Sequence, residues 1–156
     1  MKNRVDFSAA VENEMQLKLP SLSVNEGMAR SAVAAFCAQL NPTALEIADI
    51  KCAVSEAVTN AIVHGYRGYE GTGSITVTVT ILSGRAVKIE VKDKGCGIPD
   101  VGMARTPLYT TDAAGERSGM GFTVMESFTD ALKVTSRVGQ GTTVTMWKKL
   151  SERGRI

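Results

Sequence analysis

The chain has 156 residues, enough for one substantial hydrophobic core and too few for two domains. Hydrophobic residues make up 44% and charged residues 22%, and the net charge of +2 comes without a Lys/Arg run, which argues against direct nucleic-acid binding. Three separated cysteines and a single histidine exclude a Cys/His zinc site. The N-terminus lacks a signal-peptide core and no apolar run could span a membrane, so we expect a cytoplasmic protein without membrane contact.

The predicted domain covers residues 13–150, after a leader of residues 1–12 and before a tail of residues 151–156. The first predicted element of this domain is residues 15–19, where apolar and polar side chains alternate. This alternation predicts a short, half-buried strand that Pro20 ends.

Two helices are predicted next, each from a start signal. Ser23 followed by Glu26 has the spacing of a capping box, and the alanine-rich residues 28–40 behind it show helical spacing of apolar side chains. A second capping box at residues 43–46 predicts a longer helix that runs to about the histidine before Gly65. Gly65 is interpreted as the C-terminal cap of that helix.

The second half of the chain alternates in the manner of strands, apart from one loop and one helix. Residues 93–118 are rich in glycine and lack periodicity, which indicates a functional loop or lid, and residues 121–130 predict a helix. Two β-hairpins are predicted from residues 75–81, 87–91, 132–136 and 142–148. This order predicts an α+β fold, a two-layer sandwich whose mixed, mostly antiparallel sheet is covered by helices on one face.

The long predicted helix carries a thin polar stripe on an otherwise apolar surface. Glu56 and Asn60 are four residues apart and so share a face, with Asp49 two turns earlier. A solvated polar face is the ordinary explanation of such a stripe. A carboxylate beside a carboxamide is also the pair that Mg²⁺-assisted phosphoryl transfer requires, because the amide oxygen can bind the metal while the carboxylate orients or deprotonates a hydroxyl.

Three glycine-containing segments have the composition of nucleotide-binding loops. Residues 93–97 place an aspartate at a strand end, where it can accept a hydrogen bond from a base, although such a segment is often only a turn. Residues 117–121 lie at the start of a predicted helix, whose N-terminal N–H groups and dipole would favour a phosphate. The alternative is that these residues only form a flexible entry to the helix. Residues 141–143 open the last strand, where a hydroxyl could reach a base. Neither the Walker nor the dinucleotide fingerprint occurs.

These segments occur in a fixed order and together carry a family resemblance. Residues 55–65, SEAVTNAIVHG, resemble the N box of the GHKL (Bergerat-fold) superfamily, and residues 93–97, 119–121 and 141–143 resemble its glycine boxes. From about residue 13 to residue 149, the chain is similar to the sporulation anti-sigma F factors, a family of serine kinases. The most specific matches are VSEAVTNAIVHGY, PLYTT and ERSGMGFTVMESF.

The resemblance implies an ATP-dependent protein-serine/threonine kinase with ATP or ADP and Mg²⁺ as cofactors. It implies a homodimer that inhibits sigma factor F and phosphorylates a serine of an anti-anti-sigma factor. The alternatives are a kinase of the stress-response, sigma-B type and a sequestering ATP-binding module without turnover. A two-component histidine kinase is disfavoured because the sole histidine lies in the N box, and a gyrase-type or MutL-type ATPase because no transducer domain is present.

The resemblance also implies roles for single residues. Glu56 would be the general base, Asn60 would hold Mg²⁺, and Asp93 would bind the adenine amino group. Arg117 would act at the γ-phosphate. Further nucleotide contacts are implied for Gly95, Gly97, Thr110, Ser118, Gly119, Met120, Gly121 and Thr142, and sigma-factor contacts for Glu26 and Arg30.

Two departures from the family pattern bear on nucleotide exchange. Lys94 stands where the family usually has glutamate. Residues 106–116 would form the lid, and residues 112–115, Asp-Ala-Ala-Gly, replace a lid segment that commonly contains lysine.

Overall fold

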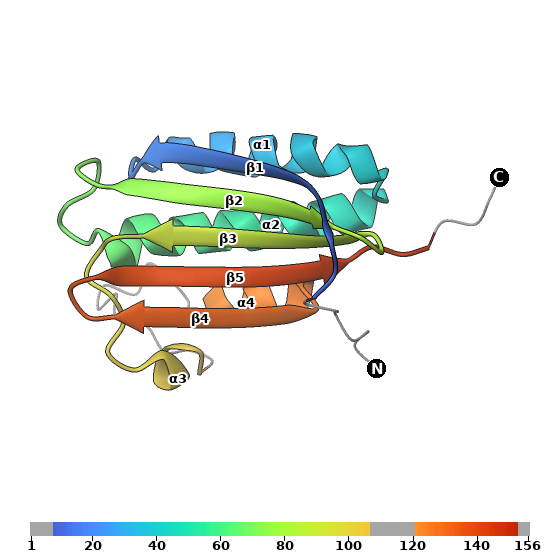
Figure 1. Ribbon diagram of the computed structural model, residues 1–156. Helices are drawn as coiled ribbons and strands as arrows, with labels where there is room; N and C mark the ends of the chain where they lie inside the picture. The colour runs from blue at the N-terminus through green and yellow to red at the C-terminus, as the bar shows by residue number, and fades with distance from the viewer. Residues whose placement is uncertain (1–7, 107–120, 153–156) are drawn as a thin grey trace.

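The computed structural model describes residues 8–106 and 121–152. Within them, five strands form one sheet in the order β1-β2-β3-β5-β4 (Figure 1). The strands are β1 (Val11–Pro20), β2 (Ser74–Leu82), β3 (Ala86–Asp93), β4 (Ala131–Arg137) and β5 (Gly141–Lys149). All four neighbouring pairs of described strands are antiparallel. In the described residues the sheet is therefore entirely antiparallel, whereas the sequence predicted a mixed, mostly antiparallel sheet.

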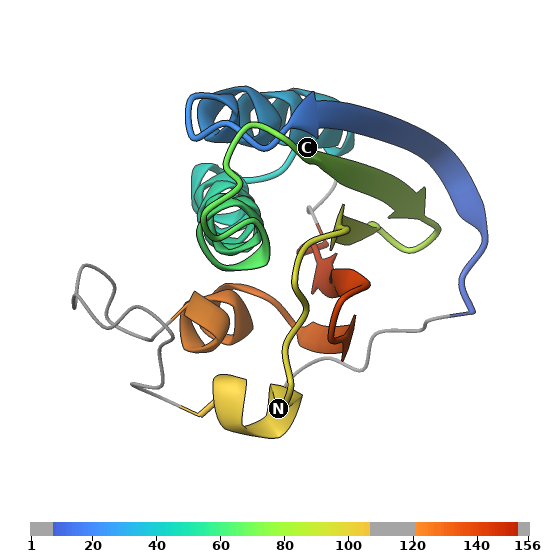
Figure 2. The same ribbon diagram turned by 90° about the vertical axis from the view of Figure 1, so that its left-hand side faces the viewer.

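The helices cover one face of this sheet, as Figure 2 shows. They are α1 (Asn25–Cys37), α2 (Ala44–Asn60) and α4 (Gly121–Phe128), while the short α3 (Val101–Ala104) lies beyond α4 at the edge formed by β4. This arrangement confirms the predicted two-layer α+β sandwich. In the described part of the chain, no helix is long and apolar enough to cross a membrane.

The core lies between the sheet and the three larger helices. Every second residue of β2 faces it, so that Val77 and Val79 are 1% and 0% exposed. From the helix layer, α2 contributes small side chains, Ala53 and Ala57, which let its backbone approach the sheet closely. Each fully buried valine or isoleucine stabilises the fold by about 1.5–3 kcal/mol. The side chains involved include Ile50, Val54, Val58, Ile75, Ile81, Val87, Ile89, Val91, Met125, Val144 and Met146.

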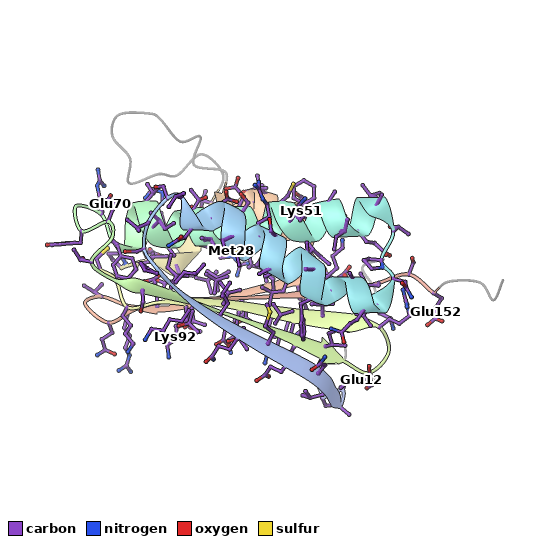
Figure 3. All side chains as sticks on the ribbon, turned by 90° about the horizontal axis from the view of Figure 1, so that it is seen from above. Glu12, Met28, Lys51, Glu70, Lys92 and Glu152 are labelled. Atoms are coloured by element: carbon purple, nitrogen blue, oxygen red, sulfur yellow. The ribbon has the colours of Figure 1, made fainter. Side chains whose placement is uncertain are left out.

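The opposite face of the sheet, which we call the open face, carries polar and charged side chains, and no helix of the described residues covers it. Lys92 projects from it, away from the helices (Figure 3). Trp147 belongs to the same face, because its strand neighbour Met146 is buried in the core and successive side chains alternate between faces. The threonines at alternate positions of β2 and β5 point to the same face; Thr76, Thr78 and Thr143 are half-buried, and Thr80 and Thr145 are buried.

One of the two predicted capping boxes is confirmed. At the start of α2, Thr43 Oγ1 accepts the Glu46 N–H at 3.1 Å and Glu46 Oε2 accepts the Thr43 N–H at 2.9 Å. The capping box predicted before α1 is wrong: Val24 is the N-cap residue and makes no side-chain cap bond. Glu26 instead forms an ion pair with Arg30, one turn along the helix, with 3.7 Å between Oε1 and Nη1.

The end of α2 also differs from the prediction. After Asn60 the chain continues as one π-helical turn, Ala61–Gly65, in which the Tyr66 N–H bonds to Ala61 O at 3.1 Å. Gly65 does not adopt the positive φ of a C-terminal cap, so that prediction is wrong. Such turns are common at functional sites, because the wider turn redirects the backbone.

At the other end of the sandwich, β1 begins at Val11, earlier than the predicted strand.

Candidate nucleotide-binding site

The two polar residues predicted on α2 lie in its last turns, and Asn60 lies where this helix meets α4. Glu56 and Asn60 are half-buried, because the opposite side of α2 packs on the sheet. The Asn60 carboxamide lies against Gly121, the first residue of α4. A Cβ atom at position 121 would lie 2.9 Å from Asn60 Nδ2 and 3.1 Å from Oδ1, so a larger residue there would displace the Asn60 carboxamide. The structure therefore brings together the N-box asparagine and the last glycine of the second glycine box.

Asp93 lies at the end of β3, on the core side of the sheet, and is 6% exposed. Its Oδ1 accepts the backbone N–H groups of Gly95 at 2.9 Å and Thr142 at 3.3 Å. Burial raises the pKa of this carboxyl, and the two hydrogen bonds lower it in part. Neither bond occupies Oδ2, which leaves that oxygen to accept a hydrogen bond from a ligand.

Three glycines pack the backbone tightly around this carboxylate. A Cβ atom at Gly65 would lie 3.0 Å from Asp93 Oδ1, and one at Gly141 would lie 2.1 Å from Asp93 O. A Cβ atom at Gly95 would lie 2.0 Å from Gly65 O, which accepts the Cys96 N–H at 2.7 Å. We call this region, made of Gly65, residues 93–97, Gly141 and Thr142, the Asp93 corner. In Figure 1 it lies at the left end of the sheet, where α2 and β3 end and β5 begins.

The turn between β4 and β5 holds the other side of the Asp93 corner. Ser136 Oγ accepts the Ile98 N–H at 2.7 Å, donates to Gly141 O at 3.0 Å and lies 2.8 Å from Thr142 Oγ1. Gly97 has a φ of 76°, and a Cβ atom there would lie 2.1 Å from Arg137 O. Sequence reasoning missed Ser136, because nothing in the pattern of β4 distinguishes it from other polar strand residues.

Asp49, the third residue of the predicted polar stripe, makes a separate contact. Lys148 Nζ lies 3.0 Å from Asp49 Oδ2 and also donates to Phe128 O at 3.0 Å. This lysine joins α2 to β5 and to the end of α4. Asp49 therefore takes part in packing the two layers and is not free to act in the site.

Comparison with known proteins agrees with this geometry. Residues 19–148 match the model of the histidine kinase-like ATPase domain. The chain is 54% identical over 140 residues to an anti-sigma F factor of Clostridium botulinum (strain Eklund 17B / Type B), which covers 90% of this chain and 96% of the relative. It is 50% identical over 141 residues to that of Clostridium acetobutylicum, with 90% and 96% covered. The chain belongs to the anti-sigma F factor family.

Solved structures support the fold of this family member. The RsbU and RsbW domains of Rv1364c from Mycobacterium tuberculosis superpose with a TM-score of 0.66 and 22% identity, over 92% of this chain and 34% of that one. The blue-light activated histidine kinase of Erythrobacter litoralis EL346 gives a TM-score of 0.57 and 21% identity, over 83% of this chain and 42% of that one.

The described residues fit an adenine nucleotide and Mg²⁺. The Asp93 corner offers a buried carboxylate with one oxygen left for an amino group, and its glycines keep side chains out of the space beside it. Asn60 supplies a carboxamide oxygen, a ligand type that Mg²⁺ accepts, and it lies against the first residue of α4. The N-terminus of α4, next to this carboxamide, favours phosphate groups.

Several predicted residues are not part of this geometry. Arg117, Ser118, Gly119, Met120 and Thr110 lie outside the described residues, as does all of the predicted lid after residue 106.

The predicted partner-binding residues lie elsewhere, on α1, which packs beside α2 and away from α4 (Figure 2). In the described part of the chain, Glu26 Oε1 and Arg30 Nε are buried and have no hydrogen-bond partner, although the two side chains form an ion pair.

Proposed function

We propose that this member of the anti-sigma F factor family is an ATP-dependent protein-serine kinase. The observation that supports it most is the pairing of Glu56 with Asn60 on one face of α2, where Asn60 lies against the first residue of α4. A carboxylate next to a metal-binding carboxamide is suited to phosphoryl transfer onto a hydroxyl. The Asp93 corner, at the same end of the sandwich, supplies a site for the base (Figure 1).

The proposed reaction assigns one task to each side chain. Asp93 Oδ2 accepts a hydrogen bond from the adenine amino group, which selects adenine over guanine. Asn60 holds Mg²⁺, which would neutralise charge on the phosphates. Glu56 accepts the proton of a serine hydroxyl while the serine oxygen bonds to the γ-phosphorus. The bond between the γ-phosphorus and the β–γ bridging oxygen breaks at the same step, and ADP leaves. Arg117 is proposed to stabilise the γ-phosphate, and Ser118, Gly119, Met120, Gly121, Thr110 and Thr142 to contact the nucleotide.

We further propose that the chain binds sigma factor F and phosphorylates an anti-anti-sigma factor. The support is the identity of 49–54% with several proteins named anti-sigma F factors, over at least 90% of this chain. Glu26 and Arg30 are the proposed sigma contacts. Their side chains are 22% and 41% exposed and form an ion pair, so they offer a carboxylate and a guanidinium to a partner that covers α1. A homodimer in the cytoplasm is part of this proposal.

A phosphotransfer assay tests the kinase proposal. The purified chain is incubated with radiolabelled ATP, Mg²⁺ and its candidate antagonist, with and without sigma factor. We expect label on a serine of the antagonist from wild type, and a loss of at least about 100-fold in rate from Glu56→Gln. ADP affinity should stay within about twofold, because Glu56 acts on the hydroxyl and not on the bound nucleotide.

The matched control is Glu12→Gln, which removes an exposed carboxylate at the far end of β1 (Figure 3). It should transfer phosphate at the wild-type rate. Full activity of Glu56→Gln would contradict the base assignment. A wild-type chain that binds sigma factor and ATP but never labels the antagonist would instead be a sequestering module without turnover.

A further inference from the structure

Tyr66 is the first residue after the π-helical turn, and sequence reasoning gave it no role. We propose that Tyr66 is a positioning residue for the base-binding carboxylate of Asp93, and so controls affinity and selectivity for adenine. The inference rests on the proposed nucleotide-binding function. It concerns a side chain that does not itself need to touch the nucleotide.

The Tyr66 hydroxyl joins three separate segments. It donates to Ser74 O, at the start of β2, at 2.6 Å. It accepts the backbone N–H of Lys94, the residue after Asp93, at 2.8 Å. The side chain is 6% exposed, so water is poorly placed to substitute for either bond. One oxygen therefore connects the end of the N-box segment to the strand end that carries the carboxylate.

The ring of Tyr66 is fixed as firmly as its hydroxyl. A Cβ atom at Gly73 would lie 2.2 Å from the ring, so the ring lies directly on the backbone of that glycine. Gly73 in turn donates its N–H to Ser21 Oγ at 3.2 Å. Because the ring cannot shift toward Gly73 and its oxygen is bonded on two sides, its position defines where the Lys94 N–H must point.

The Lys94 N–H belongs to the peptide unit that follows Asp93, so it and the Asp93 carbonyl turn together. That carbonyl lies so close to Gly141 that a Cβ there would be 2.1 Å away. The Asp93 carboxylate is held on Oδ1 by Gly95 and Thr142. Tyr66 thus fixes the backbone on which the carboxylate stands, while those two N–H groups fix its rotation. The direction of Oδ2 depends on both.

The test is Tyr66→Phe, which keeps the ring on Gly73 and removes only the oxygen. Lys94 N–H and Ser74 O then lose this partner, so the peptide after Asp93 is held less firmly. We expect ADP affinity, measured by isothermal titration calorimetry, to fall about five- to tenfold. The weaker affinity for GDP should stay unchanged, so that the ADP/GDP selectivity falls by the same factor.

Tyr69→Phe is the matched control, because Tyr69 is 65% exposed in the same connecting segment. It should bind ADP as wild type does. In an Asp93→Asn background, Tyr66→Phe should cause no further loss, because the carboxylate that it positions is gone. An equal loss for ADP and GDP, an undiminished loss in the Asp93→Asn background, or wild-type ADP affinity would each overturn the inference.

A measurement on the wild-type chain applies even if Tyr66→Phe does not fold. Amide exchange at Lys94 should slow at least about tenfold when saturating ADP is added, because a base bound to Asp93 would restrain the Asp93 corner and so stabilise the hydrogen bond from Lys94 N–H to Tyr66. An unchanged exchange rate with ADP bound would contradict the inference alone. A wild-type chain that binds no ADP would instead overturn the proposed function, and this inference with it.

Discussion

The carboxylate of Asp93 is buried by the same packing that makes it useful for binding. Burial raises its pKa, with partial compensation from the Gly95 and Thr142 N–H groups. Because the folded pKa lies above the unfolded one, the contribution of this group to stability is present at low pH and is lost as the pH rises through the folded pKa. Once it is ionised, the buried Asp93 carboxylate therefore costs folding free energy.

We predict that Asp93→Asn separates stability from binding. Asparagine keeps Oδ1 as the acceptor for Gly95 and Thr142 and removes the buried charge, so the ligand-free Tm should stay equal or rise. ADP affinity should fall at least about tenfold, because the amide would present a donor to the adenine amino group. Thermal denaturation and calorimetry check both parts. Wild-type ADP affinity in this variant would rule out the adenine assignment.

Single residues also show where sequence reasoning stops. Glu56, Asn60 and Asp93 could be selected from the sequence, because their chemistry and spacing are local. Tyr66 and Ser136 could not, since their roles come from contacts with residues distant in the chain, such as Lys94 at 28 positions and Ile98 at 38. Their hydrogen bonds exist only after the layers have packed.

At the scale of elements, the turn between β4 and β5 offers a direct comparison. Gly139 and Gly141 both have positive φ, 77° and 114°. A Cβ atom at 139 meets nothing within 4 Å, whereas one at 141 would lie 2.1 Å from Asp93 O. Both substitutions by alanine strain the backbone, but only the second also collides with the backbone of the Asp93 corner.

We predict that Gly139→Ala destabilises the fold by about 1 kcal/mol, from the backbone conformation alone. Gly141→Ala should cost about 3 kcal/mol or more and should also weaken ADP binding, because Asp93 must move. Urea unfolding measures the first effect and calorimetry the second. Equal destabilisation by the two variants would show that the close approach at Gly141 is relieved at no cost.

Elements were predicted where their signals are local. The hairpins, and the start of α2 at Thr43, follow from alternation and from a capping box whose two bonds both form. The start of α1 was mispredicted because Glu26 has a competing partner in Arg30. The π-helical turn after Asn60 was not predicted, since no residue type marks it and Gly65 had a simpler reading as a cap.

At the scale of the whole molecule, the segment that follows β5 is bonded to the start of α2. Ser151 donates its N–H to Glu46 Oε1 at 2.7 Å, while Glu46 Oε2 accepts the Thr43 N–H. Burial tends to raise the pKa of Glu46, but the hydrogen bonds from Ser151 and Thr43 outweigh it and lower the pKa from 4.5 to about 2. The stability that Glu46 contributes is thus present above its unfolded pKa and is lost as the pH falls toward the folded one.

We predict that Glu46→Gln lowers the Tm at neutral pH and that this difference from wild type narrows as the pH falls from about 5 to about 3. The neutral amide offers a single acceptor oxygen, so it cannot serve Thr43 and Ser151 together. Melting curves of both proteins across this range provide the check. A Tm difference that did not depend on pH would show that the charge of Glu46 is not involved.

The open face of the sheet gives the protein an optical property. Trp147 is the sole tryptophan of the chain and lies on the face away from α2 and α4, with Lys88 and Ala131 as its neighbours across the strands. The Asp93 corner is on the other side of the sheet and at its far end. The intrinsic fluorescence of this protein therefore monitors what covers the open face of the sheet, separately from the filling of the nucleotide site.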